Sequence, residues 1–92
     1  MLKERVIAIL AWSGMKLPQL EKLTGISRYT WSNLKNRSKS REIKEEEILA
    51  IAKVFPQFRW WLLTGEVIPG VGQISPDYEN ANRNLTEQKN AE

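Results

Sequence analysis

The sequence contains no cysteine and no histidine. Without cysteine the chain has no disulfide to reinforce its core and no thiol to act as a nucleophile or metal ligand. Without histidine it lacks the commonest general base, the commonest metal ligand and the side chain that titrates near neutral pH. Neither a glycine-rich phosphate loop nor a nucleophile–base pair is visible. We therefore expect a protein that is not an enzyme and that uses no cofactor or metal.

Long apolar runs are also missing. No segment approaches the roughly 18 consecutive apolar residues that span a membrane. The N-terminus has no apolar stretch followed by a small-residue cleavage site. At 92 residues the chain is bounded to one small domain plus a tail, with a thin core. We expect a cytoplasmic protein without a membrane partner.

Charge is distributed unevenly along the chain. Residues 1–44 contain ten basic and three acidic side chains, a net charge of +7, whereas residues 45–92 contain four basic and eight acidic side chains, a net charge of −4. Six of the basic residues lie between Arg28 and Lys44, with one acid among them. Such a cluster is either a solvated basic face or a surface that binds phosphates, and its position in the fold decides between the two.

Apolar side chains recur at helical spacing over most of the chain, and no segment shows the alternation typical of a strand. Gly14 and Gly25 stand where two helices would end, because glycine permits the left-handed conformation there. Ser27 is a good N-cap for the helix that follows. The expected helices cover residues 2–12, from Pro18 to Thr24, 28–35, 44–54 and 57–63. The glutamates at 45–47 are interpreted as carboxylates that favour the start of a helix.

The segment after Gly65 has a different composition. Regular structure is interrupted by Pro69, Gly70, Gly72 and Pro76. From Asp77 onward the chain is polar, and two interpretations stay open, a marginal helix and a disordered tail. The expected architecture is all-α, with five helices in a domain over residues 1–66. A C-terminal extension over residues 67–92 would serve as a dimerisation arm or a flexible tail.

Residues 17–36, LPQLEKLTGISRYTWSNLKN, predict two short helices joined by a tight turn at Thr24-Gly25-Ile26. Two helices that cross steeply need such a turn, and glycine removes the steric cost of a positive φ. The side chains expected to pack between the helices are Leu20, Ile26, Trp31 and Leu34. Five side chains would then lie on the outer face of the helix over residues 28–35, namely Arg28, Tyr29, Ser32, Asn33 and Asn36.

This segment resembles the helix-turn-helix of the Cro/phage-repressor (Xre-type) DNA-binding regulators. The resemblance covers about residues 2–65 and includes the order of five helices. The blocks WLLTGE (61–66) and GQISP (72–76) also resemble small phage and prophage members. The resemblance implies a phage-repressor-like fold and a transcriptional regulator of the phage or prophage type. Such a protein would work in the cytoplasm of a bacterial host, associated with the nucleoid.

The chain departs from the family pattern at three places. The family usually has a small residue where Glu21 stands, because the second and third helices approach closely there. It usually has a β-branched residue at the position of Trp31. Members often hold a phosphate with a glutamine or similar side chain at the start of the second helix, where this chain has Leu17-Pro18. Gln19 is the nearest substitute.

The resemblance places the helix over residues 28–35 in the major groove of double-stranded DNA. It implies that Arg28 contacts a guanine and Asn33 an adenine, while Ser32 and Tyr29 also reach bases. The alternatives are a phosphate contact or a solvated charge for Arg28, and a bond to backbone or water for Asn33. The phosphate contacts that the resemblance implies are Gln19, Lys35, Asn36, Arg37, Lys39 and Arg41.

Members of the family generally bind inverted repeats as two-fold dimers, which implies a homodimer. The expected dimer surface is Phe58, Trp60, Trp61 and Leu62. Two tryptophans in one short helix are more than a thin core holds, and exposed aromatics suit an interface. The alternative is that both tryptophans belong to the core or are covered by the loop over residues 67–74.

Two other functions stay open. The same fold also serves as an antitoxin, a DNA-binding module whose acidic C-terminal half binds a partner protein. The net charge of −4 after residue 44 permits this alternative. RNA binding is a third interpretation, but only Tyr29 is well placed as a stacking aromatic.

Overall fold

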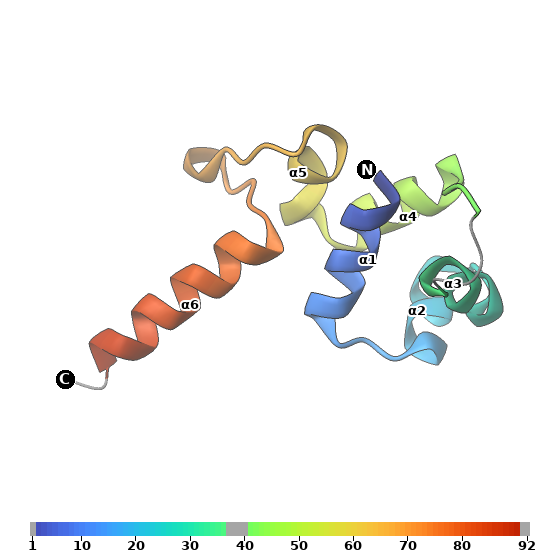
Figure 1. Ribbon diagram of the computed structural model, residues 1–92, viewed down its shortest axis with the longest axis horizontal. Coiled ribbons are helices and arrows are strands. Elements are labelled where there is room, and N and C mark those ends of the chain that lie inside the picture. The colour runs from blue at the N-terminus through green and yellow to red at the C-terminus, as the bar shows by residue number, and fades with distance from the viewer. Residues whose placement is uncertain (1, 37–40, 91–92) are drawn as a thin grey trace.

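The computed structural model describes residues 2–36 and 41–90, with side chains through residue 83. The described part of the chain is all-α, as predicted, and its helices are shown in Figure 1. In order they are α1 (Leu2–Ser13), α2 (Leu17–Thr24), α3 (Arg28–Lys35), α4 (Glu45–Val54), the 3-10 turn η1 (Pro56–Phe58), α5 (Arg59–Thr64), the 3-10 turn η2 (Pro69–Val71) and α6 (Pro76–Asn90).

Local signals in the sequence set the ends of the first helices. Gly25 follows α2 with a φ of +73°, and its backbone N–H donates to the carbonyl of Glu21. Only glycine adopts this left-handed geometry without a steric cost. Ser27 is the N-cap of α3, and its hydroxyl accepts a hydrogen bond of 3.2 Å from the backbone N–H of Tyr29. Both predicted ends are confirmed.

The core is formed by side chains from α1 to α5 and from the turn η1. Trp31 and Phe58 are the largest of its fully buried side chains. The ring of Trp12 stands edge-on to Phe58, with 5.0 Å between centroids, a favourable geometry for two aromatics. The buried hydrophobic set is Val6, Ile9, Leu10, Leu20, Trp31, Leu34, Ile51, Phe55, Phe58 and Leu62.

The segment expected to form one helix over residues 57–63 is divided in two. Pro56 begins η1, and Phe58 has φ −105° and ψ 5°, so α5 starts only at Arg59. This bridge conformation is not helical. The side chain of Phe58, at this junction, is fully buried in the core.

The open question about the C-terminal tail is answered by α6. Ser75 begins this helix, because its buried hydroxyl accepts from the backbone N–H of Tyr78 at 3.0 Å. The guanidinium of Arg83 lies 5.9 Å from the centre of the Trp12 ring and links α6 to α1. Beyond this contact α6 extends away from the helices around α1, on the side opposite α2 and α3 (Figure 1). The molecule is elongated, with extents of 45 × 25 × 25 Å.

Candidate nucleic-acid interface

The turn between α2 and α3 is fixed by one threonine. The Thr24 hydroxyl donates to the Leu20 carbonyl at 2.7 Å and accepts from the backbone N–H of Ile26 at 3.1 Å. It also accepts a hydrogen bond of 3.2 Å from the indole N–H of Trp31, a side chain that is fully buried. Trp31 therefore fills the space beneath α3 and satisfies its only donor at the same time. Thr24 thus joins the end of α2, the turn and the buried face of α3.

The outer face of α3 carries the predicted polar side chains. Arg28, Tyr29 and Ser32 are exposed, and 75% of the Tyr29 surface is open to solvent. Asn33 is half-buried, while Lys35 and Asn36 are exposed at the end of the helix. Gln19 is exposed on α2. The structure thus brings four of the predicted base contacts onto one helix, with Lys35 and Asn36 directly after them.

Glu21 links α2 to the start of α3. Its Oε2 accepts from the backbone N–H of Arg28 at 2.9 Å, so Glu21 satisfies a donor that the helix itself leaves unpaired. Its Oε1 accepts from Nε and Nη2 of the same arginine, at 3.1 and 2.9 Å. These hydrogen bonds and the arginine charge hold the pKa of Glu21 below its ordinary value. The residue that departs from the family pattern is therefore tied to the leading candidate for base contact.

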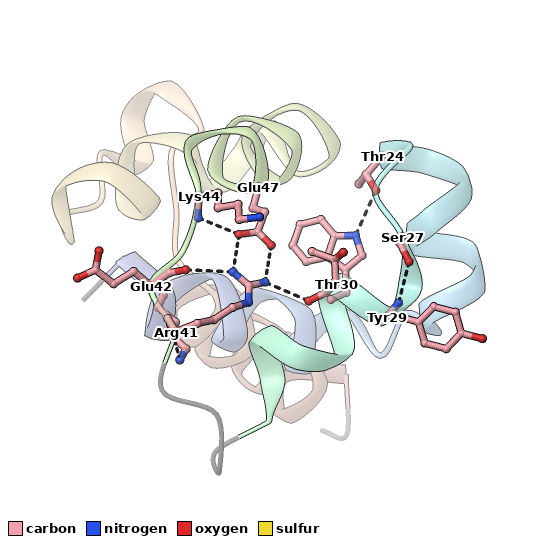
Figure 2. A network of polar contacts seen from close by, with 10 residues as sticks. Thr24, Ser27, Tyr29, Thr30, Arg41, Glu42, Lys44 and Glu47 are labelled. Carbon is pink, nitrogen blue, oxygen red and sulfur yellow. Dashed lines mark hydrogen bonds and ion pairs between the residues drawn. The ribbon is translucent and has the colours of Figure 1, made fainter.

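A second ion pair anchors residues 41–44, which precede α4 (Figure 2). Arg41 donates from Nη1 to Glu47 Oε1 at 3.0 Å and from Nη2 to Glu47 Oε2 at 2.6 Å. The same guanidinium donates to the carbonyls of Thr30 on α3 and of Glu42, both at 3.0 Å. Glu47 Oε1 also accepts from the backbone N–H of Lys44 at 2.8 Å. One arginine therefore ties α3, α4 and the intervening segment together.

Glu47 was not found by sequence reasoning. The helix-start interpretation holds for all three glutamates, which occupy the first turn of α4. It did not predict that the side chain of Glu47 is fully buried and paired with Arg41. Burial alone would raise its pKa, yet the hydrogen bonds from Arg41 and the Lys44 backbone outweigh it and leave the pKa below the ordinary value. A signal was present, because a third glutamate at position N3 of a helix commonly folds back to the N-cap N–H.

The predicted phosphate contacts are placed unequally. The guanidinium of Arg41 donates to four protein oxygens, so its hydrogen bonds are directed into the protein and not toward a phosphate. Arg37 and Lys39 lie outside the described residues. Gln19, Lys35 and Asn36 keep an exposed position.

The predicted dimer surface needs a correction. Phe58 of η1 and Leu62 of α5 are fully buried within the chain, where both belong to its hydrophobic core. Trp60 is 41% exposed and Trp61 is half-buried. Around Trp60 the structure has an apolar surface groove of about 310 Å³. It is lined by Arg59, Trp60, Leu63, Ile68, Val71 and Gln73. We call these six residues the α5 groove.

The fold and the exposed face of α3 define a helix-turn-helix protein. Residues 5–56 match the family described as the Cro/C1-type HTH DNA-binding domain, which is more than half of the chain. The chain belongs to this family, and it is accordingly a DNA-binding regulator rather than an enzyme.

A solved structure is similar over nearly the whole length. Pf6r from the filamentous phage Pf6 of Pseudomonas aeruginosa PA01 superimposes with a TM-score of 0.81 at 32% identity. The similarity covers 92% of this chain and 96% of that chain, so it includes the segment after α5. No curated protein matches the sequence. Among the described residues no helix is long and apolar enough to cross a membrane.

Proposed function

We propose that the chain is a repressor of the phage or prophage type that binds an inverted-repeat operator as a homodimer. The observation that carries this proposal is the exposed polar face at the start of α3, in a chain that belongs to a DNA-binding helix-turn-helix family. In this motif the second of the two helices, here α3, enters the major groove with its N-terminal residues at base edges. The protein would act in the bacterial cytoplasm, at the nucleoid.

The side chains of α3 divide by role. Arg28, Tyr29, Ser32 and Asn33 are proposed to contact bases. An arginine reads guanine through two donors aimed at O6 and N7, and an asparagine reads adenine at N6 and N7. Lys35, Asn36 and Gln19 are proposed to contact phosphates, which sets affinity rather than sequence. Arg37 and Lys39 complete the proposed phosphate set on the basis of charge alone.

A second copy is proposed to cover the α5 groove. Trp60, Leu63, Ile68 and Val71 account for four of the seven large hydrophobic side chains that are exposed in the described chain. Their concentration at one site is typical of an interface, since apolar patches on single chains are rare. Two-fold pairing there would present two α3 helices to an operator with two half-sites.

Selection from random duplex DNA tests the function directly. The wild type should enrich a palindromic sequence with half-sites one helical turn apart or a multiple of it. Arg28→Ala should lose roughly 1–3 kcal/mol on the selected site and relax one base position. Lys53→Ala is the matched control, because it removes one exposed positive charge from the end of α4. Enrichment of no sequence by the wild type would contradict the proposal.

The alternative is an antitoxin-like module whose C-terminal half binds a partner protein. The exposed α5 groove favours it as much as it favours a second copy. A chain that ends at Ser75 tests the repressor, because a repressor that pairs through α5 should keep full operator binding without α6. Binding of a partner toxin by the full chain, but not by the chain that ends at Ser75, would support the antitoxin-like alternative.

A further inference from the structure

Glu21 on α2 forms hydrogen bonds with Arg28, the leading candidate for a base contact. Its carboxylate divides its two oxygens between two tasks. Oε2 accepts from the backbone N–H of Arg28, and Oε1 accepts from two nitrogens of the Arg28 guanidinium. The first contact fixes where α3 begins, and the second fixes where the arginine points. Both are made by one side chain on α2.

The edge of the guanidinium that Glu21 holds is the one formed by Nε and Nη2. A guanidinium has five N–H donors in a planar fork. Glu21 uses one donor from Nε and one from Nη2, which leaves both donors of Nη1 and the second donor of Nη2. No hydrogen bond from Nη1 is formed within the described residues. The remaining donors form the end of the fork, and two of them lie parallel.

Two parallel donors are what a guanine requires, because its O6 and N7 accept side by side in the major groove. A long arginine side chain has high rotamer entropy, and fixing it beforehand reduces what is lost on binding. The side chains of Arg28 and Glu21 stay 44% and 34% exposed, so the free end of the fork can reach a partner. The carboxylate also keeps a negative charge at this position, which disfavours a phosphate as the partner of Arg28.

We propose that Glu21 is a positioning residue for base recognition, which fixes Arg28 with one guanidinium edge on the protein and the end of the fork free for a guanine. This inference rests on the function proposed above. It assigns to Glu21 the selection between the two roles of Arg28, a base contact and a phosphate contact. Removal of Glu21 converts Arg28 into a mobile side chain that prefers the phosphates.

The test is selection from a randomised duplex library, followed by titration of the selected duplex and its single-base variants. The proteins are the wild type, Glu21→Ala, Glu21→Gln, Arg28→Ala and the double variant. Glu66→Gln is the matched control, since it removes one exposed carboxylate that follows α5 and lies outside the helix-turn-helix. Thermal unfolding of each variant measures its stability separately.

The wild type is expected to discriminate guanine at one position of each half-site by roughly 5- to 150-fold, the range of a good bidentate contact. Glu21→Ala should reduce discrimination at that position to the level of Arg28→Ala, and leave the other positions unchanged. Its affinity for random duplex should equal or exceed that of the wild type, because a negative charge is lost. The double variant should lose no more discrimination than Arg28→Ala alone. Glu66→Gln should keep the wild-type profile.

Several outcomes would overturn the inference. Unchanged guanine discrimination in Glu21→Ala would show that Arg28 needs no support. Tighter operator binding with discrimination intact would show that Glu21 competes with DNA for Arg28. A uniform loss at all positions would mean that Glu21 acts only on the start of α3. Glu21→Gln decides where Glu21→Ala is unstable, because it keeps an acceptor for the Arg28 backbone N–H and loses the charge. If the wild type itself selects no sequence, the proposed function fails first.

Discussion

At the scale of single residues, the proposed function gives Lys35, at the end of α3, a different role from that of the side chains before it. Lys35 is exposed directly after the half-buried Asn33 and the buried Leu34. In the proposed function, a lysine at this place would contact the backbone of a duplex whose bases are read by the first turns of the helix. Phosphate contacts carry no sequence information, so its effect should be the same on every duplex.

Lys35→Ala is expected to weaken binding to the operator and to random duplex by similar factors. It should also flatten the slope of log K against log salt by about one unit, because one fewer counterion is released. Titrations at several salt concentrations measure this. Lys53→Ala serves again as the exposed lysine on α4 that should leave the slope unchanged. A larger loss on the operator than on random DNA would assign Lys35 to the bases.

Side-chain partners were the part of the site that sequence could not supply. The outer face of α3 follows from the periodicity of Trp31 and Leu34, which are both buried. The pairs Glu21–Arg28 and Arg41–Glu47 join residues seven and six positions apart. Neither separation matches the three or four residues at which side chains meet on one helix. Both pairs depend on how elements cross, which periodicity does not report.

At the scale of elements, the Arg41–Glu47 pair connects α4 with the segment after α3. The two partners are buried unequally, because the side chain of Glu47 is 0% exposed and that of Arg41 is 26% exposed. A charge left alone in the interior is costly, whereas one that reaches water is not. The two substitutions should therefore have different consequences.

Arg41→Ala should cost about 3–5 kcal/mol of unfolding free energy, because it strands the buried carboxylate. Glu47→Gln should cost about 1–3 kcal/mol, since the amide still accepts from the Lys44 N–H and Arg41 can turn to solvent. Urea unfolding of both variants gives the comparison. Glu46→Gln, an exposed neighbour in the same helix turn, should change stability little. Equal losses of unfolding free energy in Arg41→Ala and Glu47→Gln would show that leaving the Glu47 carboxylate unpaired has no additional cost.

Stability should depend on pH only in acid. Glu21 and Glu47 have pKa values below the ordinary 4.5, so their native contacts stabilise the fold above that pH. The contribution is lost as the pH falls through the lower pKa of the folded state. With no histidine or cysteine, unfolding free energy should be nearly level between about pH 6 and 8. Urea unfolding at pH values from about 8 to 3 measures this dependence. A change of unfolding free energy near neutral pH would contradict the expectation that only the carboxylates contribute to it.

Helix positions were predictable to the extent that their signals are local. Ser27 and Gly25 marked the two ends around the turn, and the structure has both. The division between η1 and α5 was not predictable, since it depends on the core receiving Phe58. The start of α6 had a signal in Ser75-Pro76, but its polar sequence left the helix undecided. Its link to α1 through Arg83 and Trp12 spans most of the chain.

At the scale of the whole molecule, α5 lies on the other side of α1 from α3 (Figure 1). The α5 groove is lined by residues of α5 and of the segment that follows it. Pairing through the groove would leave α3 accessible in both copies. The groove residue Leu63 is 58% exposed, and a charge there should prevent a second apolar surface from covering it.

Leu63→Glu is expected to shift the protein toward monomer and to weaken operator binding more than binding to a single half-site. Sedimentation equilibrium measures the first effect and duplex titration the second. Leu49→Glu is the matched control, because Leu49 is 60% exposed on α4 and lies outside the groove. A wild type that is monomeric at micromolar concentration would contradict pairing in free solution.

The anchoring of Arg41 also has a consequence for sequence variation. The buried carboxylate of Glu47 and the guanidinium of Arg41 share two hydrogen bonds, so Glu47 is acceptable only beside Arg41, whereas Arg41 alone can turn to solvent. Among homologous chains the two positions should covary, with an uncharged residue at one accompanied by an uncharged residue at the other. Descent through a single replacement would pass through a destabilised form. The pair is therefore expected to change in steps that begin at Glu47, whose loss the fold tolerates better.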